Sequence, residues 1–74
     1  MPLTNLPVKR SGVIKSIENQ GLIRRRLLDL GFVPGTRIQT VRKSPSGNPI
    51  AYLIRGTVIA LRKEETDLIM VDID

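Results

Sequence analysis

The chain alternates between short aliphatic runs and turn-forming residues, and this punctuation restricts it to a small, mainly β fold. Runs with strand composition occupy residues 13–17, 36–43, 50–55, 57–62 and 68–73. Their Ile, Val and Thr side chains favour pleated strands, whereas the Gly, Pro, Ser and Asn residues between the runs favour turns. The loop at residues 44–49, Ser-Pro-Ser-Gly-Asn-Pro, is expected to join two antiparallel strands as a hairpin.

One stretch, residues 20–30, has helical spacing instead. At 100° per residue, Ile23, Leu27 and Leu30 fall in one stripe, which we expect to face the core, with Leu22 at its margin. Gly31 follows at the place where a helix commonly ends in the left-handed conformation. On the same geometry Leu28 projects roughly 140° away from the stripe and is expected to face solvent.

The length of 74 residues predicts a single domain, residues 1–74. Phe32 and Tyr52 are the only aromatic residues, so the core must be built from Ile, Leu and Val. We expect Phe32 in the core and take Tyr52 as the one candidate for an exposed ring. About five strands with one helix after the first predict a small, strongly bent antiparallel β-barrel, with Gly12 and Gly56 as points where a strand could bend.

Several kinds of chemistry are missing from the chain. It has no histidine and no cysteine, which removes the commonest transition-metal ligands and the usual catalytic base. No Gly-Lys pair of a phosphate-binding loop occurs. Glu64, Glu65 and Asp67 lack the spacing of a calcium loop and predict a solvated turn, with one glutamate near an arginine. We therefore expect no enzyme activity and no catalytic, cofactor or metal site.

The amino-terminal residues lack the apolar segment of a signal peptide, and no run is long enough to span a membrane. The sequence thus predicts a cytoplasmic protein. Its net charge of +5 favours an acidic partner, which could be nucleic acid, an anionic membrane surface or an acidic protein surface.

The nucleic-acid interpretation rests on basic residues that could contact phosphates, namely Lys9, Arg10, Lys15, Arg37, Arg42, Lys43, Arg55, Arg62 and Lys63. Small barrels that bind single strands usually add several aromatic rings on which bases stack. Because this chain offers Tyr52 alone, nucleic acid is kept as the alternative and is not the expected partner.

The helical stretch favours a protein partner. Arg24, Arg25 and Arg26 fan across 200° of a helix and cannot form one concentrated patch, and Arg25 can pair with Asp29. If Leu22, Leu28 and Val33 share a surface, they form a small apolar patch rimmed by arginine. That composition is typical of the centre of a protein interface.

The segment RRRLLDLGFVPGT, followed by GNPIAYLIRGTVIALRKEE and a last apolar strand, resembles the FeoA family of small ferrous iron transport accessory proteins. The likeness extends over nearly the whole chain. Its recurring pieces are Arg26-Leu27, Leu30-Gly31, Pro34-Gly35, Pro49-Ile50, Gly56 and Ala60-Leu61-Arg62. One departure is Thr66, where the family pattern leads us to expect alanine; the position follows a turn, so we expect little effect on the fold.

The resemblance implies an SH3-like barrel with a helix inserted after the first strand. It also implies a partner, FeoB, the membrane ferrous iron transporter with an attached GTPase domain, whose cytoplasmic part this non-enzymatic accessory protein would bind. Contact with the membrane would then be through the partner only. The family is not thought to need metal ligands.

We expect an interface that includes Leu22, Arg25, Leu28 and Val33, with Arg24, Arg42 and Lys43 steering the encounter with an acidic surface. The alternative function is a small basic nucleic-acid-binding barrel. A module for proline-rich peptides would need an aromatic-lined groove, which two aromatic residues hardly supply. The sequence does not predict whether the protein self-associates.

Overall fold

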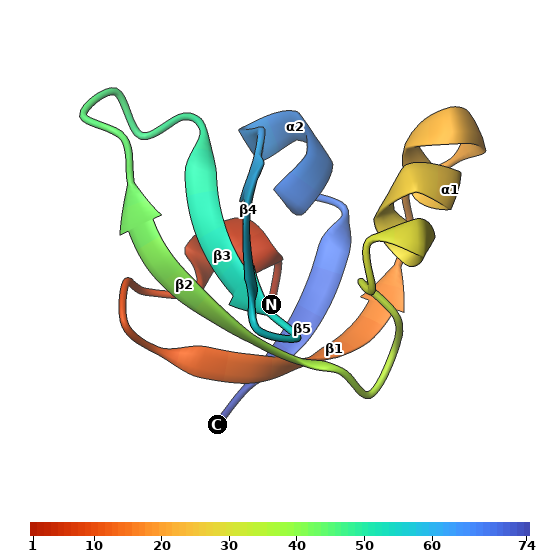
Figure 1. Ribbon diagram of the computed structural model, residues 1–74, viewed down its shortest axis with the longest axis horizontal. Coiled ribbons are helices and arrows are strands. Elements are labelled where there is room, and N and C mark those ends of the chain that lie inside the picture. Colours follow the sequence, from red (N-terminus) through yellow and green to blue (C-terminus); the bar gives the residue numbers. More distant parts are fainter.

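The computed structural model describes residues 1–74 and contains one curled sheet with two short α-helices (Figure 1). The strands are β1 (Ser11–Ile17), β2 (Arg37–Lys43), β3 (Ile50–Ile54), β4 (Thr57–Leu61) and β5 (Ile69–Ile73). The helices are α1 (Gly21–Asp29), α2 (Lys63–Thr66) and a 3₁₀ turn at Leu3–Asn5. The predicted strands and the predicted helix are all present. The polar turn predicted after β4 is the helix α2.

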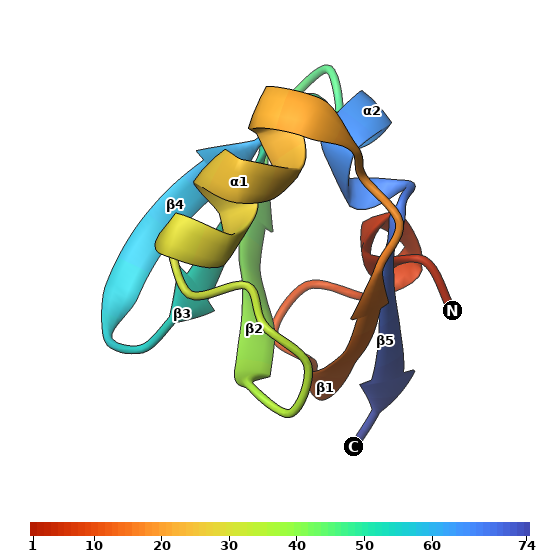
Figure 2. The same cartoon turned by 90° about the vertical axis from the view of Figure 1, so that its right-hand side faces the viewer.

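The five strands form one sheet in the order β4-β3-β2-β1-β5, and every neighbouring pair is antiparallel. Figure 2 shows the curled sheet with β4 towards one side, β5 towards the other and α1 in front of the space between them. The mostly β architecture of five antiparallel strands with a helix after the first strand is confirmed. Because β4 and β5 are not paired, the barrel is open.

The core is aliphatic, as the composition predicts, and strand alternation builds it. In β3, Ile50, Tyr52 and Ile54 point to the same face, and each is at most 1% exposed. Phe32 is fully buried, as expected. The expectation that Tyr52 could be an exposed ring is wrong, because its place between two buried isoleucines on one strand directs it into the core.

Gly12 and Gly56 serve different purposes. A Cβ atom on Gly12 would lie 2.6 Å from the carbonyl oxygen of Asp72, so the close approach of β1 and β5 requires glycine there. Gly56 has φ 78° and follows Arg55 at φ 50°, which makes a tight two-residue turn between β3 and β4. The predicted bends are thus a close approach of two strands and a hairpin turn.

The rotation of α1 about its own axis differs from the prediction. Of the expected core stripe only Leu27 is buried, whereas Ile23 is 47% and Leu30 37% exposed. Leu28, which was expected to face solvent, is half-buried and packs against the core. Leu22 is instead the most exposed apolar side chain of the helix, at 86%.

The end of α1 explains this rotation. The amide of Phe32 donates to the carbonyl of Leu27 at 2.9 Å, and the amide of Gly31 donates to that of Leu28 at 3.0 Å. This is a Schellman motif, in which the residue beyond the glycine packs on the last helical turn. Since Leu27 and Phe32 are both core residues, the motif turns the Leu27–Leu28 side inward and leaves Leu30 at the surface.

Two ion pairs connect segments that are distant in the sequence. Arg26 of α1 pairs with Glu65 of α2 at 2.7 Å, which fulfils the expectation of a glutamate near an arginine. Arg37 pairs with Asp74 at 2.7 Å, and the predicted pair of Arg25 with Asp29 is not formed. Neither helix has the length and apolar character needed to cross a membrane.

Candidate protein interface

The exposed side of α1 carries three aliphatic side chains, Leu22, Ile23 and Leu30, which we call the α1 patch. Their spacing along the helix places them in one sector, with Arg26 between them. The Arg26 side chain is 51% exposed, and its ion pair with Glu65 fixes it against α2. An apolar surface with a fixed cation within it is typical of a protein contact rather than of a phosphate site.

Helix ends set the extent of this surface. Gly21 begins α1 with φ 65° after the extended residue Gln20, and Gly31 ends it with φ 100°. Leu22 therefore lies on the first turn and Leu30 just after the last. Leu27 is the fully buried residue of α1, whereas Leu22 and Ile23 are left at the surface.

The predicted residues Arg24, Arg25 and Leu28 do come together, but on a different side of α1 from the patch. They line a shallow hollow with Gly21 and Asp29. The guanidinium group of Arg24 donates to the carbonyl of Ile17 at the end of β1, so that side chain is anchored to the fold. Leu28 lines the hollow and also packs on the core.

The remaining predicted site residues lie elsewhere. Val33 is half-buried in the turn after α1. Arg42 and Lys43 are exposed at the end of β2, on the opposite side of the molecule from α1 (Figure 1). The set expected from the sequence is therefore not one continuous surface.

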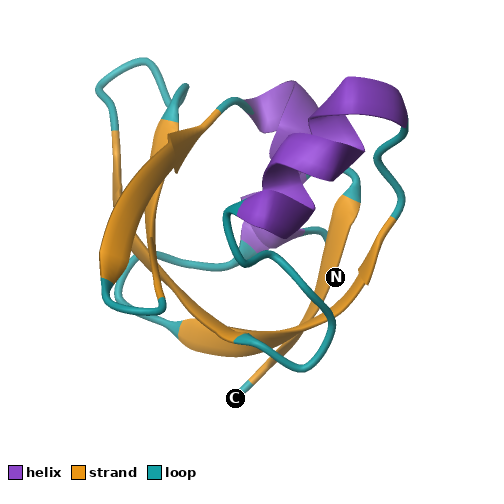
Figure 3. Cartoon of the chain, turned by 45° about the vertical axis from the view of Figure 1, so that its right-hand side comes forward, coloured by secondary structure: helices purple, strands orange, loops and turns teal.

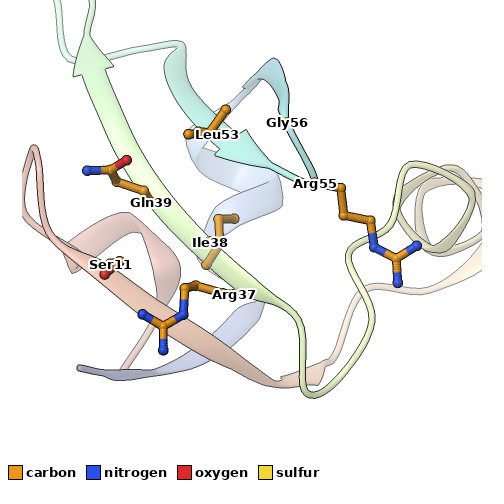
Figure 4. Close-up of a pocket in the computed structure, with 7 residues that line it drawn as sticks. All are labelled: Ser11, Arg37, Ile38, Gln39, Leu53, Arg55 and Gly56. Carbon is orange, nitrogen blue, oxygen red and sulfur yellow. The ribbon is translucent and has the colours of Figure 1, made fainter.

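Another hollow lies beside β2 and the β3–β4 turn (Figure 4). It is lined by Ser11, Arg37, Ile38, Gln39, Leu53, Arg55 and Gly56. Its two arginines do not converge. Arg37 pairs with Asp74, and Arg55 extends away from Arg37 towards Gly31, where its Cδ atom would lie 3.1 Å from a Cβ atom added to that glycine. A bound anion would find no pair of guanidinium groups facing it here.

The structure holds no group of three or more His, Cys, Asp or Glu side chains that could bind a metal ion. Tyr52 is the titratable group with a clear perturbation. Burial raises the pKa of its phenol to about 12, the neighbouring Thr66 hydroxyl opposes that rise, and the Asp67 carboxylate adds to it.

Sequence reasoning missed Ile23 and Leu30 as surface residues. The signal that could have found them is the pair Gly31 and Phe32. A glycine at a helix end followed by a large apolar residue identifies the residue five positions before that apolar residue, here Leu27, as its packing partner. Counting from Leu27 then places Ile23 and Leu30 together to one side of the buried position.

An open antiparallel sheet of five strands, one covering helix and an apolar helix face define a small SH3-like protein with a surface suited to protein contact. The FeoA domain family matches residues 1–73, and the chain belongs to this family. FeoA proteins take part in ferrous iron transport.

Three relatives illustrate the likeness. A fusion of Fe(2+) transport protein A with the Fe(2+) transporter FeoB from Porphyromonas gingivalis is 34% identical over 73 residues, which is 99% of this chain and 9% of the fusion protein. The chain thus spans about a tenth of the length of this curated relative.

The solved structures agree over the whole fold. Iron(II) transport protein A from Clostridium thermocellum is 40% identical with a TM-score of 0.94, covering 99% of this chain and 45% of that one. Stenotrophomonas maltophilia FeoA, complexed with zinc and described as an SH3 domain protein, is 37% identical with a TM-score of 0.87. The match covers 97% of this chain and 89% of that protein.

Proposed function

We propose that the protein is a non-enzymatic accessory protein of bacterial ferrous iron uptake that binds the cytoplasmic part of a FeoB-type transporter. The observation that carries this proposal is the Porphyromonas gingivalis relative, in which a domain 34% identical to this chain is fused to FeoB. Fusing two domains raises their effective concentration towards each other, which is useful when they act together. A separate chain needs a binding surface to achieve the same association.

The α1 patch supplies that surface. Leu22 is 86% exposed, so it can be buried by a partner without disturbing the core of this protein. Arg25 forms no ion pair and follows Leu22 by three residues, at the border between the patch and the hollow that it lines, so it would contribute to a polar rim. The net charge of +5 favours encounter with an acidic face of the transporter, and Arg42 and Lys43 contribute only to this long-range attraction.

The test is titration calorimetry with the purified cytoplasmic part of a FeoB-type transporter, comparing the native chain with the Leu22→Glu variant. Placing a charge at the centre of an apolar contact is expected to weaken binding by roughly 2 kcal/mol or more. Leu28→Glu is the wrong variant for this purpose, since Leu28 packs on the core and its substitution would perturb folding.

Val8→Glu is the matched control, because Val8 is an exposed aliphatic residue, 41% accessible, outside α1. It should bind like the native chain. If the native chain fails to bind the transporter, the proposed function is wrong. If the native chain and Leu22→Glu bind equally well, the function can stand but the α1 patch is not the site.

A further inference from the structure

The two edges of the sheet differ in how they are covered. The edge of β5 is occupied by the start of the chain: the Met1 amino group donates to the carbonyl of Val71 at 2.9 Å, and the Val71 amide donates to the carbonyl of Met1 at 2.8 Å. Pro2 forms a bridge to Met70 on the same edge. On the other side β4 has β3 as its only strand neighbour. Figure 3 shows the strands curling around one side of the molecule and the helices lying at the open side of the curl.

The register of the β3–β4 hairpin shows which groups of β4 are free. Ile54 and Thr57 flank the two-residue turn and form its first hydrogen-bonded pair. In an antiparallel ladder such pairs alternate with pairs whose amides and carbonyls point outward. Val58, paired with Leu53, and Ala60, paired with Ala51, are therefore the residues whose backbone groups face away from the sheet.

The sequence and the pairing of β4 lack the charges, prolines and bulges that usually protect an edge. The β4 sequence Thr-Val-Ile-Ala-Leu contains no charge and no proline, and its pairing with β3 continues without a bulge. Val58 is 53% exposed and lies opposite Leu53, which is 36% exposed, so the outer face of the hairpin is apolar as well. Free backbone groups beside apolar side chains are what an added strand requires.

Cations stand at both ends of the uncharged strand. Arg55 precedes it, Arg62 and Lys63 follow it, all three are exposed, and none takes part in an ion pair. We propose that β4 accepts an extended segment of a partner protein as a further strand of the sheet. The segment that fits has alternating aliphatic residues in its middle and carboxylates at both ends.

A second copy of this chain fits the same edge less well. Antiparallel pairing of two β4 strands about Ile59 would align Val58 with Ala60 of the other copy. This arrangement would also bring Arg55 at one end of each strand near Arg62 and Lys63 at the other end of its neighbour, which places like charges together twice. The added strand would lie along β4 whereas the α1 patch lies on the helix, so substitutions in one element can be compared with substitutions in the other.

The test uses the acetylated and amidated peptide Asp-Asp-Val-Thr-Val-Thr-Val-Asp-Asp, titrated into ¹⁵N-labelled native protein. We expect saturable amide shifts and slowed hydrogen exchange at Val58 and Ala60. A matched peptide with lysine in place of each aspartate should bind at least about tenfold more weakly at low salt. The proposal is overturned if the acidic peptide leaves Val58 and Ala60 unaffected, or if both peptides bind equally.

Backbone pairing is tested from both partners. Ala60→Pro removes an outward donor without removing a ladder bond and should weaken binding about tenfold, whereas Ala60→Ser keeps the donor and should bind normally. Since Ala60→Pro could fail to fold, the peptide is also prepared in two N-methylated versions, with the methyl groups on alternate residues and offset by one position. Alternate amides of an added strand point towards β4, so one version should lose binding and the other should retain it. Equal binding by both contradicts strand addition.

Two further measurements separate this inference from its rivals. Leu22→Glu should bind the acidic peptide like the native chain, whatever happens to its binding of the transporter. Sedimentation should show a native monomer. A native dimer that Ala60→Pro disperses would mean that a second copy occupies the edge, and the proposal of a partner strand would then be wrong.

Discussion

At the scale of single residues, the buried polar groups are the least expected feature. Thr66, which was expected to matter little, is fully buried; its hydroxyl lies 2.6 Å from that of Thr4 and donates to the carbonyl of Lys63 at 3.2 Å. Because the Thr66 hydroxyl is already engaged in these two contacts, the neighbouring Tyr52 hydroxyl is buried without a well-formed hydrogen bond. The alternation of Ile50, Tyr52 and Ile54 predicts that the ring is buried, but no sequence pattern reveals which hydroxyl it meets.

Tyr52 makes folding sensitive to alkali. Its pKa is about 12 in the folded protein, compared with an ordinary value of about 10. Between these pH values the unfolded chain loses the phenolic proton and the folded one keeps it, so the free energy of unfolding falls as pH rises from about 10 to 12, by about 2 kcal/mol. Below pH 10 this contribution is complete.

Because Tyr52 is the only tyrosine and there is no tryptophan, tyrosinate absorbance reports this group alone. Urea unfolding of the native protein and of Tyr52→Phe across the same pH range separates the contribution of Tyr52 from that of the lysines, which also titrate there. The free energy of unfolding should fall less steeply with pH in Tyr52→Phe than in the native protein. A native absorbance midpoint near pH 10, or identical pH profiles for the two proteins, would contradict the assignment.

At the scale of elements, positions along the chain were predictable and orientation was not. Strands have a side-chain period of two, and the turn residues between them fix their ends, so all five were placed correctly. In α1 the apolar residues Leu22, Ile23, Leu27, Leu28 and Leu30 surround most of the helix. A helical pattern that broad permits several rotations, and only the packing of Phe32 beyond Gly31 selects one of them.

The contact between α1 and α2 depends on one carboxylate. Glu65 accepts hydrogen bonds from Arg26 at 2.7 Å through Oε2 and from the Arg62 backbone amide at 3.0 Å through Oε1. Glu65→Ala removes both and should lower the free energy of unfolding by about 1–2 kcal/mol. Glu64 is exposed and forms no such bond, so Glu64→Ala should change stability by about 0.5 kcal/mol or less.

Thermal and urea unfolding of the two variants measure this difference. Equal stability of Glu65→Ala and Glu64→Ala would mean that the link between the helices contributes nothing.

The candidate interface was only partly predictable from the sequence. Leu22 and Arg25 are exposed as expected, but the rotation of α1 and the distance of Arg42 and Lys43 from it are tertiary facts that residue spacing does not contain.

At the scale of the whole molecule, the basic character is dispersed. Of twelve lysines and arginines, only Arg26 and Arg37 form ion pairs, and the others are spread over the strands, α1 and the loops. With Phe32 and Tyr52 both fully buried, the surface offers no aromatic ring for a base to stack on. Charge alone then provides weak attraction to nucleic acid that salt easily screens.

The prediction is that a fluorescent single-stranded oligothymidylate shows no saturable binding at physiological salt. At low salt any binding should be weak and should disappear on adding salt, because counterion release would be its only source. Fluorescence anisotropy at two salt concentrations measures this. Tight binding that survives physiological salt would favour the nucleic-acid alternative over the accessory role.

The arrangement of β1 has a consequence for how the molecule reaches its native state. β1 lies between β2 and β5, and Gly12 is paired with Ile73, near the other end of the sequence. A nascent chain emerging from the ribosome cannot complete this ladder until the last strand has been synthesised. Closing so long a loop is entropically slow, so the final collapse is expected to follow translation of the domain rather than accompany it.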